Sequence, residues 1–310
     1  MTLTTLTADW HKLGGLMFVA RRLVEGLLTG QHAAVGLGPG VDFHDYRAYT
    51  PGDPLSDVDW KLYGRTDRFY LRRYRHLSEL HAYLMLDCSA SMHFTGLDRR
   101  GRPLPAKQVP TKLSYGAALA AAIGFLTIRQ ADRAGVGLFS DRIIEHLPPG
   151  GTWAHLKRLC TVLENARPQQ GQGRLRASLR QAHGLMKRRG LLVIISDLLE
   201  DPDELLDGLS RFRHDRFEVI VFQTLSPQEL DLSGLDRLSL EMVDAETHQR
   251  LRTDVDRTAK AYAERMQQHI SQIRRGCLGQ GIDFNLLCTD QPVTGALRRY
   301  LVKRSAAVGG

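Results

Sequence analysis

Three oxygen-bearing side chains follow a short apolar segment in the first third of the chain. Asp87, Ser89 and Ser91 occupy alternate positions directly after residues 82–86, whose composition is typical of a buried strand. One carboxylate and two hydroxyls are hard oxygen donors of the kind that Mg²⁺ and Mn²⁺ prefer. The spacing therefore predicts part of a divalent-cation site at the carboxyl end of a strand.

A second carboxylate follows another apolar segment. Asp197 comes directly after residues 190–196, which also predict a buried strand. Open α/β sheets bind their ligands outside the carboxyl ends of the strands, where the last residues of neighbouring strands meet. We therefore expect Asp197 to complete a set of four metal ligands with Asp87, Ser89 and Ser91. Each aspartate could instead cap a following helix or loop, and this alternative stays open.

The elements that must position these residues alternate between strand and helix from residue 81 onward. This pattern predicts an α/β fold with a mostly parallel sheet flanked by helices. The expected strands are 81–87, 134–140, 142–147, 190–196, 216–224 and 282–288. The expected helices are 111–129, 152–165, 175–188, 203–212, 254–278 and 293–302. We expect two parts, an amino-terminal extension over 1–80 and the α/β domain over 81–305, with an apolar stripe in 10–29 predicting a helix that packs on the domain.

The extension contains a segment dense in charged and aromatic residues between 42 and 70. Basic side chains there could neutralise the acidic ones while the rings of Tyr46, Tyr49 and Trp60 pack beneath. Turns are expected at 51–53 and 66–67. The residues that stand out are Arg47, Tyr49, Gly52, Asp53, Asp59, Trp60, Lys61 and Arg65.

The order of those residues resembles the signature of the bacterial domain-of-unknown-function 58 family. Its members read Arg-x-Tyr-x-x-Gly-Asp, then Ile/Val-Asp-Trp-Lys, then Ala/Gly-Arg-Thr, and the three parts stand here at 47–53, 58–61 and 64–66. Asp87-x-Ser89-x-Ser91 also resembles the metal-ion-dependent adhesion site of von Willebrand factor A domains. Together these resemblances span about residues 20–300 and imply a von Willebrand A-like, Rossmann-type fold.

The resemblance implies an adaptor without catalytic residues. Members of the family look like proteins that accompany MoxR-type AAA+ ATPases and help them remodel or mature client proteins. A Mg²⁺ or Mn²⁺ ion at the predicted site could then accept a carboxylate from the partner. The adhesion site normally includes a threonine from a later loop, but Gly173 stands at the aligned position. The predicted site therefore lacks one usual ligand.

Two other functions stay open. In a metal-assisted phosphoester hydrolase, Asp87 and Asp197 would hold the metal while His93 or Asp141 served as base. The sequence has no His-Glu-x-x-His pair and no Gly-x-Ser-x-Gly elbow, which disfavours other hydrolase mechanisms. In a metal-free interaction module, the segment 45–68 would be the working surface.

Composition favours a cytoplasmic protein of ordinary globular type. The 310 residues carry a formal charge of +8, but the arginines are spread out and do not alternate with aromatic residues, so nucleic acid is not expected as the main partner. The four cysteines are far apart, as in proteins with reduced thiols. The chain lacks the roughly 20 consecutive apolar residues that cross a bilayer, and residues 1–9 do not resemble a signal peptide.

Overall fold

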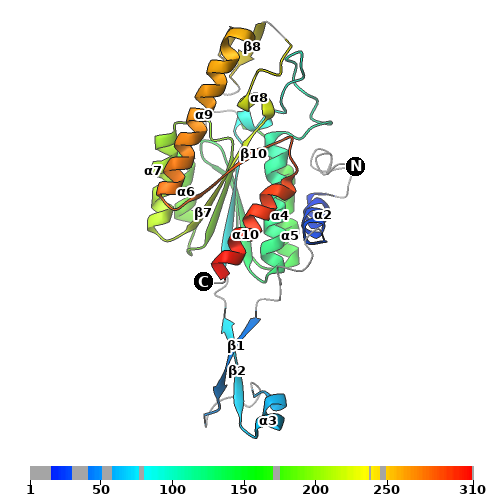
Figure 1. Cartoon of the computed structure of the whole chain (residues 1–310), viewed down its shortest axis with the longest axis vertical. Coiled ribbons are helices and arrows are strands. Elements are labelled where there is room, and N and C mark those ends of the chain that lie inside the picture. Colours follow the sequence, from blue (N-terminus) through cyan, green and yellow to red (C-terminus); the bar gives the residue numbers. More distant parts are fainter. Residues whose placement is uncertain are drawn as a thin grey trace.

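The computed structural model describes residues 15–29, 41–50, 58–76, 80–169, 175–236, 239–244 and 249–308. An α/β body carries a two-stranded hairpin that extends away from it (Figure 1). Each described helix is too short or too polar to cross a lipid bilayer. The four cysteines are free thiols.

A six-stranded sheet forms the centre of the body. Its strands are β3 (His81–Asp87), β4 (Arg133–Phe139), β5 (Ile143–Gly150), β6 (Leu191–Ser196), β7 (Glu218–Leu225) and β10 (Asp283–Cys288). They lie in the order β10-β7-β6-β3-β4-β5, and only β5 runs antiparallel to its neighbour. Counted along the chain, this is the doubly wound order 3-2-1-4-5-6, which reverses direction beside the first strand. The predicted α/β fold with a mostly parallel sheet is confirmed.

Helices cover both faces of this sheet (Figure 1). One face carries α2 (Leu16–Thr29), α4 (Lys112–Arg129), α5 (Trp153–Asn165) and α10 (Val293–Val308). The other carries α6 (Leu175–Leu185), α7 (Pro202–His214) and α9 (Val255–Gly279). Alternate residues of β3 supply the two cores, because successive side chains of a strand point to opposite faces. Leu84 and Leu86 pack with α4, whereas Tyr83 and Met85 pack on the side of α6 and α7.

The amino-terminal helix packs on the body as expected. In α2, the side chains of Leu16, Val19, Leu23 and Val24 are fully buried in the core that also contains α4. The helix was predicted over 10–29, and residues 10–14 lie outside the described part of the chain. The division of the chain at residue 80 stays a prediction.

Besides the three elements of the amino-terminal hairpin described below, several short elements were not predicted. They are the 3₁₀ turn η3 (Ala90–His93), α8 (Pro227–Leu230), and the antiparallel pair of β8 (Ser239–Val243) and β9 (Arg250–Asp254). The residues of β9 are mostly exposed, so its sequence carries no apolar alternation from which a strand could be predicted. The α8 turn has only four residues, fewer than a periodic pattern requires.

The amino-terminal extension forms an antiparallel hairpin. Its strands β1 (Val41–Ala48) and β2 (Tyr70–His76) are joined through the short helix α3 (Trp60–Thr66). Of the two expected turns, the one at 66–67 coincides with the end of α3, where Asp67 has a φ of 54°, and the one at 51–53 lies outside the described residues. The expectation that Trp60 packs beneath the charged residues is wrong, since its side chain is 57% exposed. Trp60 begins α3, which lies at the end of the hairpin away from the body (Figure 1).

Candidate interaction and cation site

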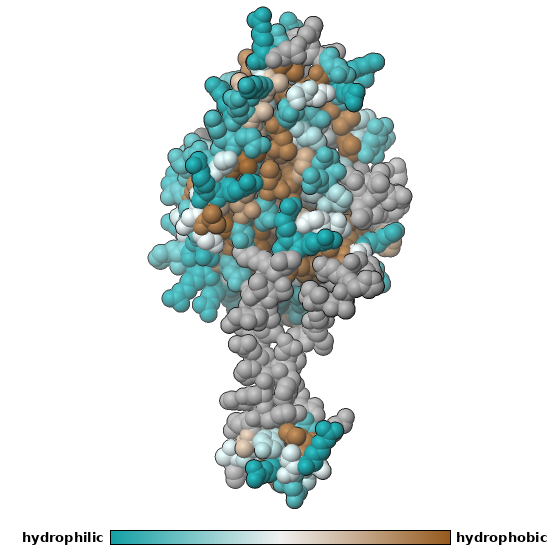
Figure 2. Space-filling model, viewed as in Figure 1, coloured by the Kyte–Doolittle hydropathy of each residue, from teal (hydrophilic) through white to brown (hydrophobic). Residues whose placement is uncertain are grey.

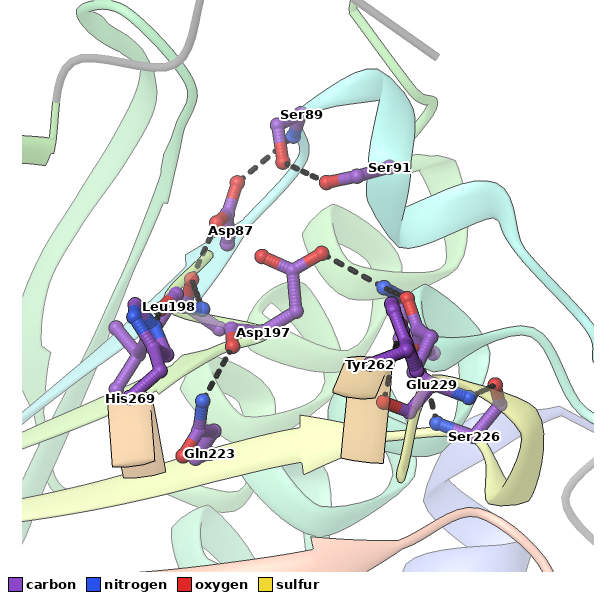
Figure 3. A network of polar contacts seen from close by, with 12 residues as sticks. Asp87, Ser89, Ser91, Asp197, Leu198, Gln223, Ser226, Glu229, Tyr262 and His269 are labelled. Atoms are coloured by element: carbon purple, nitrogen blue, oxygen red, sulfur yellow. Dashed lines mark hydrogen bonds and ion pairs between the residues drawn. The ribbon is translucent and has the colours of Figure 1, made fainter. Parts of the chain in front are cut away.

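The reversal of the sheet brings two aspartates to one edge. Asp87 is the last residue of β3, and Asp197 directly follows β6, the parallel strand beside it. Both residues are buried. Their carboxylates lie near Ser89 and Ser91 at the carboxyl edge of the sheet (Figure 3). The structure therefore gathers all four residues that the sequence predicted for this site.

The Asp87 carboxylate is held on both oxygens. The Ser89 amide donates a hydrogen bond to Oδ1 at 2.8 Å, and the Ser196 hydroxyl donates to Oδ2 at 2.5 Å. The hydroxyls of Ser89 and Ser91 share a hydrogen bond of 3.1 Å. Burial and the neighbouring charge of Asp197 raise the pKa of Asp87 to about 7. This carboxyl group is therefore partly protonated near neutral pH.

The backbone after β6 fixes the position of Asp197. Leu198 adopts a φ of 53°, an uncommon conformation for a non-glycine residue. Its amide donates to the Ser196 hydroxyl at 3.1 Å, and its carbonyl lies 2.7 Å from Nε2 of His269 in α9. The carbonyl of Asp197 accepts a bond of 2.9 Å from the Gln223 side chain in β7. Two neighbouring elements thus hold the turn that carries the aspartate.

A lysine that the sequence analysis did not single out occupies this edge. The Lys112 ammonium lies 2.7 Å from Oδ2 of Asp197 and 2.5 Å from Oε1 of Glu229, and the lysine side chain is 0% exposed. Burial alone would lower the pKa of Lys112, but the charges of Asp197 and Glu229 outweigh it and raise that pKa. The lysine is therefore charged.

Glu229 is fixed from two sides. Its Oε2 accepts a bond of 2.8 Å from the Ser226 amide, and its carbonyl accepts one of 3.1 Å from the Tyr262 hydroxyl in α9. Ser226-x-x-Glu229 forms a capping box, which the sequence analysis did not single out. The position of Lys112 in the sequence could have indicated that it has an acidic partner. A lysine at the first position of a helix opposes the helix dipole and therefore calls for a compensating partner.

A divalent cation fits the donor chemistry only in part. Asp87, Ser89 and Ser91 offer hard oxygens, but Oδ2 of the fourth predicted ligand, Asp197, is engaged by the Lys112 ammonium. Among the described residues, no three His, Cys, Asp or Glu side chains gather as a metal cluster. Metal binding stays a prediction.

Thr152 does not take the place of the threonine that the adhesion site normally includes. Gly173 lies outside the described residues, although the chain leading to it runs beside the motif, where the Gln169 amide donates to the Cys88 carbonyl at 2.7 Å. Thr152 instead caps α5 by accepting a bond of 3.1 Å from the His155 amide. It lies at the opposite edge of the sheet, since nearby Gly150 pairs with Ala134 at the start of β4.

The described residues of the family signature lie in the stem and at the tip of the hairpin. Asp59 is buried and caps α3, with Oδ1 accepting a bond of 3.1 Å from the Leu62 amide. Tyr49 donates its amide to the Phe69 carbonyl at 2.9 Å. Trp60 and Arg65 are exposed. Arg47 lies in β1 and Lys61 in α3, but their side chains are outside the described part, as are Gly52 and Asp53 entirely.

Comparison with known proteins places these features in a family. The family model described as "Protein of unknown function DUF58" matches residues 45–272. The chain belongs to the DUF58 family. Uncharacterized proteins of Mycobacterium bovis (Mb1516) and Mycobacterium tuberculosis (Rv1480) are each 26% identical to this DUF58 chain over 293 residues, which is 93% of this chain and 87% of theirs.

Two solved structures are also similar to the chain. The conserved hypothetical protein BatB from Bacteroides thetaiotaomicron gives a TM-score of 0.47 at 13% identity, covering 73% of this chain and 99% of BatB. The von Willebrand A (VWA) domain of SpRpn10 gives a TM-score of 0.39 at 8% identity, covering 71% of this chain and 95% of that domain. The von Willebrand A-like arrangement of this DUF58 protein is visible in its own topology, with β3, α4, the β4–β5 pair, two helices and then β6 followed by Asp197.

Proposed function

We propose that this DUF58 protein is a non-catalytic adaptor that binds a partner protein at the carboxyl edge of its sheet. The convergence of Asp87, Ser89, Ser91 and Asp197 beside the reversal of the strand order supports this proposal, because open α/β sheets bind ligands there. The partner implied by the family resemblance is a MoxR-type AAA+ ATPase. The setting would be cytoplasmic protein remodelling or maturation.

Hydroxyl groups would make the first contact with that partner. Ser91 is partly exposed, whereas Ser89 and the two aspartates are buried behind it. If the site takes up Mg²⁺ or Mn²⁺, Asp87, Ser89 and Ser91 would hold it. The ion would supply an open coordination position for a carboxylate of the partner.

The test is the affinity of the purified chain for a purified MoxR-type ATPase from the same organism. We expect Ser91→Ala to weaken binding about five- to tenfold, the effect of losing one interfacial hydrogen bond. Ser210→Ala is the matched control, because Ser210 is an exposed serine on α7 whose hydroxyl bonds only locally, to the Asp207 carbonyl. Equal affinities of wild type and Ser91→Ala would contradict the proposal.

A second candidate surface is the tip of the hairpin, working without metal. Tyr63 and Phe69 stack with centroids 4.4 Å apart, and Trp60 lies edge-on to both rings. Exposed Arg65 and Arg68 flank this cluster. Tryptophan, tyrosine and arginine are the residues that most often dominate protein interfaces. If Trp60→Ala abolishes ATPase binding while Ser91→Ala does not, the hairpin tip is the working surface.

The hydrolase alternative rests on different residues. His93 is exposed on η3, and Asp141 pairs with Arg142 at 3.4 Å beyond the end of β4. Turnover of a generic phosphoester with Mg²⁺ that is abolished by Asp87→Asn would replace the adaptor proposal with this alternative.

A further inference from the structure

The Lys112 side chain is fully buried at the carboxyl edge of the sheet. Lysine is rarely fully buried unless its charge is compensated, because removing an ammonium from water is costly. Here two carboxylates compensate it, at 2.7 Å from Asp197 and 2.5 Å from Glu229. The start of α4 is itself anchored to the motif loop, since the Lys112 amide donates to the Phe94 carbonyl at 3.1 Å. The ammonium therefore has a fixed position against Asp197, one of the predicted metal ligands.

The two carboxylates are directed toward that position by other parts of the fold. Asp197 is held through its own carbonyl by Gln223 and through Leu198 by His269. Glu229 is held through Oε2 by the Ser226 amide and through its carbonyl by Tyr262. These bonds fix the backbone of both acidic residues and one carboxylate oxygen of Glu229, while each carboxylate contacts the ammonium.

A divalent ion at Asp197 would meet an existing positive charge. The ammonium already takes Oδ2 of this residue. Like charges in a buried site of low effective dielectric repel strongly, so the ion could bind only by displacing the lysine. The displaced ammonium would then lie buried without its partner Asp197, which is unfavourable. Charge repulsion and the cost of leaving the ammonium without its partner therefore both oppose uptake of the ion.

We propose that Lys112 is the resident cation of this site and takes the place of the divalent ion implied by the resemblance to adhesion sites. Lys112, Asp197 and Glu229 form a permanent ion cluster across α4, β6 and α8. Wild-type protein accordingly takes up no Mg²⁺ or Mn²⁺ at this edge. Replacing Lys112 by an uncharged residue opens a cradle of carboxylates and hydroxyls that does bind such an ion.

Calorimetric titration of the full chain with MnCl₂ and MgCl₂ tests this proposal without any partner protein, so its failure is distinct from failure of the adaptor function. We expect wild type and the exposed-lysine control Lys107→Met to show no saturable binding up to about 1 mM metal. Lys112→Met should bind Mn²⁺ at least about tenfold more tightly than wild type and gain thermal stability from it. Adding Asp87→Asn to Lys112→Met should remove that binding.

Two results would overturn the proposal. The first is saturable Mn²⁺ binding by wild type that disappears in Asp87→Asn. The second is a folded Lys112→Met variant that also fails to bind. Because Lys112→Met leaves two buried carboxylates without their cation, it is paired with Lys112→Met/Glu229→Gln, which removes one charge of each sign and keeps the net charge of the cluster. The double variant should also bind Mn²⁺.

Discussion

Lys112 and Asp197 form a buried ion pair, with the ammonium nitrogen 2.7 Å from Oδ2 across 85 positions of sequence. The pair joins the first residue of the central helix α4 to the residue that follows β6. It lies at the reversal of the strand order, where the two most informative carboxylates of the sequence meet. The stability of this edge and its ability to bind a cation therefore depend on the same lysine.

Removing the lysine should destabilise the fold strongly. We expect Lys112→Met to lower the free energy of unfolding by about 3–5 kcal/mol, because it leaves buried carboxylates without their partner. Lys107→Met, at an exposed position, should change it by less than about 0.5 kcal/mol. Urea denaturation of the three proteins makes the comparison. Equal stability of Lys112→Met and Lys107→Met would show that the ion cluster contributes nothing.

The Asp87 carboxyl should make stability depend on pH. Its pKa is raised from 3.8 to about 7 by burial and the charge of Asp197, so between these values the folded state binds a proton that the unfolded state does not. The contribution of this proton to the free energy of unfolding is complete below the pKa of the unfolded state. It is lost as the pH rises through the pKa of the folded state. Asparagine keeps both hydrogen bonds, with its carbonyl accepting from the Ser89 amide and its amide donating to Ser196.

The variant Asp87→Asn tests this effect, because it removes the Asp87 carboxyl and leaves every other titrating group in place. Relative to wild type, it should gain roughly 1–3 kcal/mol in free energy of unfolding between about pH 4.5 and pH 8. Denaturant titrations across this range provide the measurement. A difference that stays constant with pH would mean that the Asp87 pKa is not raised.

Glycine at one position of α4 permits close packing on the sheet. A Cβ at Gly116 would lie 2.7 Å from Cδ1 of Leu86 and 2.9 Å from Cγ2 of Ile195, so Gly116→Ala should destabilise by about 1–3 kcal/mol. Gly184 in α6 has open space around its Cβ position, and Gly184→Ala should stabilise by about 0.5–1 kcal/mol. Thermal denaturation should therefore move the two melting temperatures in opposite directions. A lower melting temperature for both variants would refute the packing argument.

The exposed tip of the hairpin should tolerate loss of its largest ring. Trp60 is 57% exposed, so Trp60→Ala should cost less than about 1 kcal/mol. Phe212→Ala, at a fully buried aromatic position, should cost about 3–5 kcal/mol. Chemical denaturation of both variants checks this. A loss for Trp60→Ala as large as that for Phe212→Ala would place the ring in a core.

The sheet and the meeting of its two aspartates could be predicted because they follow from continuous patterns in the sequence. The strand 81–87 is an unbroken run of buried residues after His81, and the structure has the same bounds. Once β3 and β6 are neighbours, parallel geometry alone brings Asp87 and Asp197 to one edge. Local spacing and a general rule of sheet topology were sufficient to predict that these two aspartates meet.

The ion cluster could not be predicted in the same way. Lys112 is 85 positions from Asp197 and 117 from Glu229, and no pattern of spacing connects residues so distant. Glu229 also has a local role in a capping box with Ser226, and that motif indicates no distant partner. The exposure of Trp60 was missed for a related reason. Large aromatic residues usually pack inside a domain, but this one lies on a hairpin that leaves the body.

The space-filling view shows how polar and apolar residues are distributed over one face of the molecule. Polar residues cover much of the visible face of the body, with apolar groups between them, and a small apolar group lies among polar residues at the end of the hairpin (Figure 2). The carboxyl edge beside α8 and the hairpin tip at α3 lie at opposite ends of the molecule (Figure 1), so a partner protein could contact one without the other.

Amide hydrogen exchange of the chain with and without a purified MoxR-type ATPase tests the central claim most directly, because it locates the contact on the molecule. The account predicts slower exchange in the complex at residues 88–94, 197–200 and 226–231, which surround the carboxyl edge. Slower exchange confined to residues 58–70 at the hairpin tip, or no change anywhere, would contradict it.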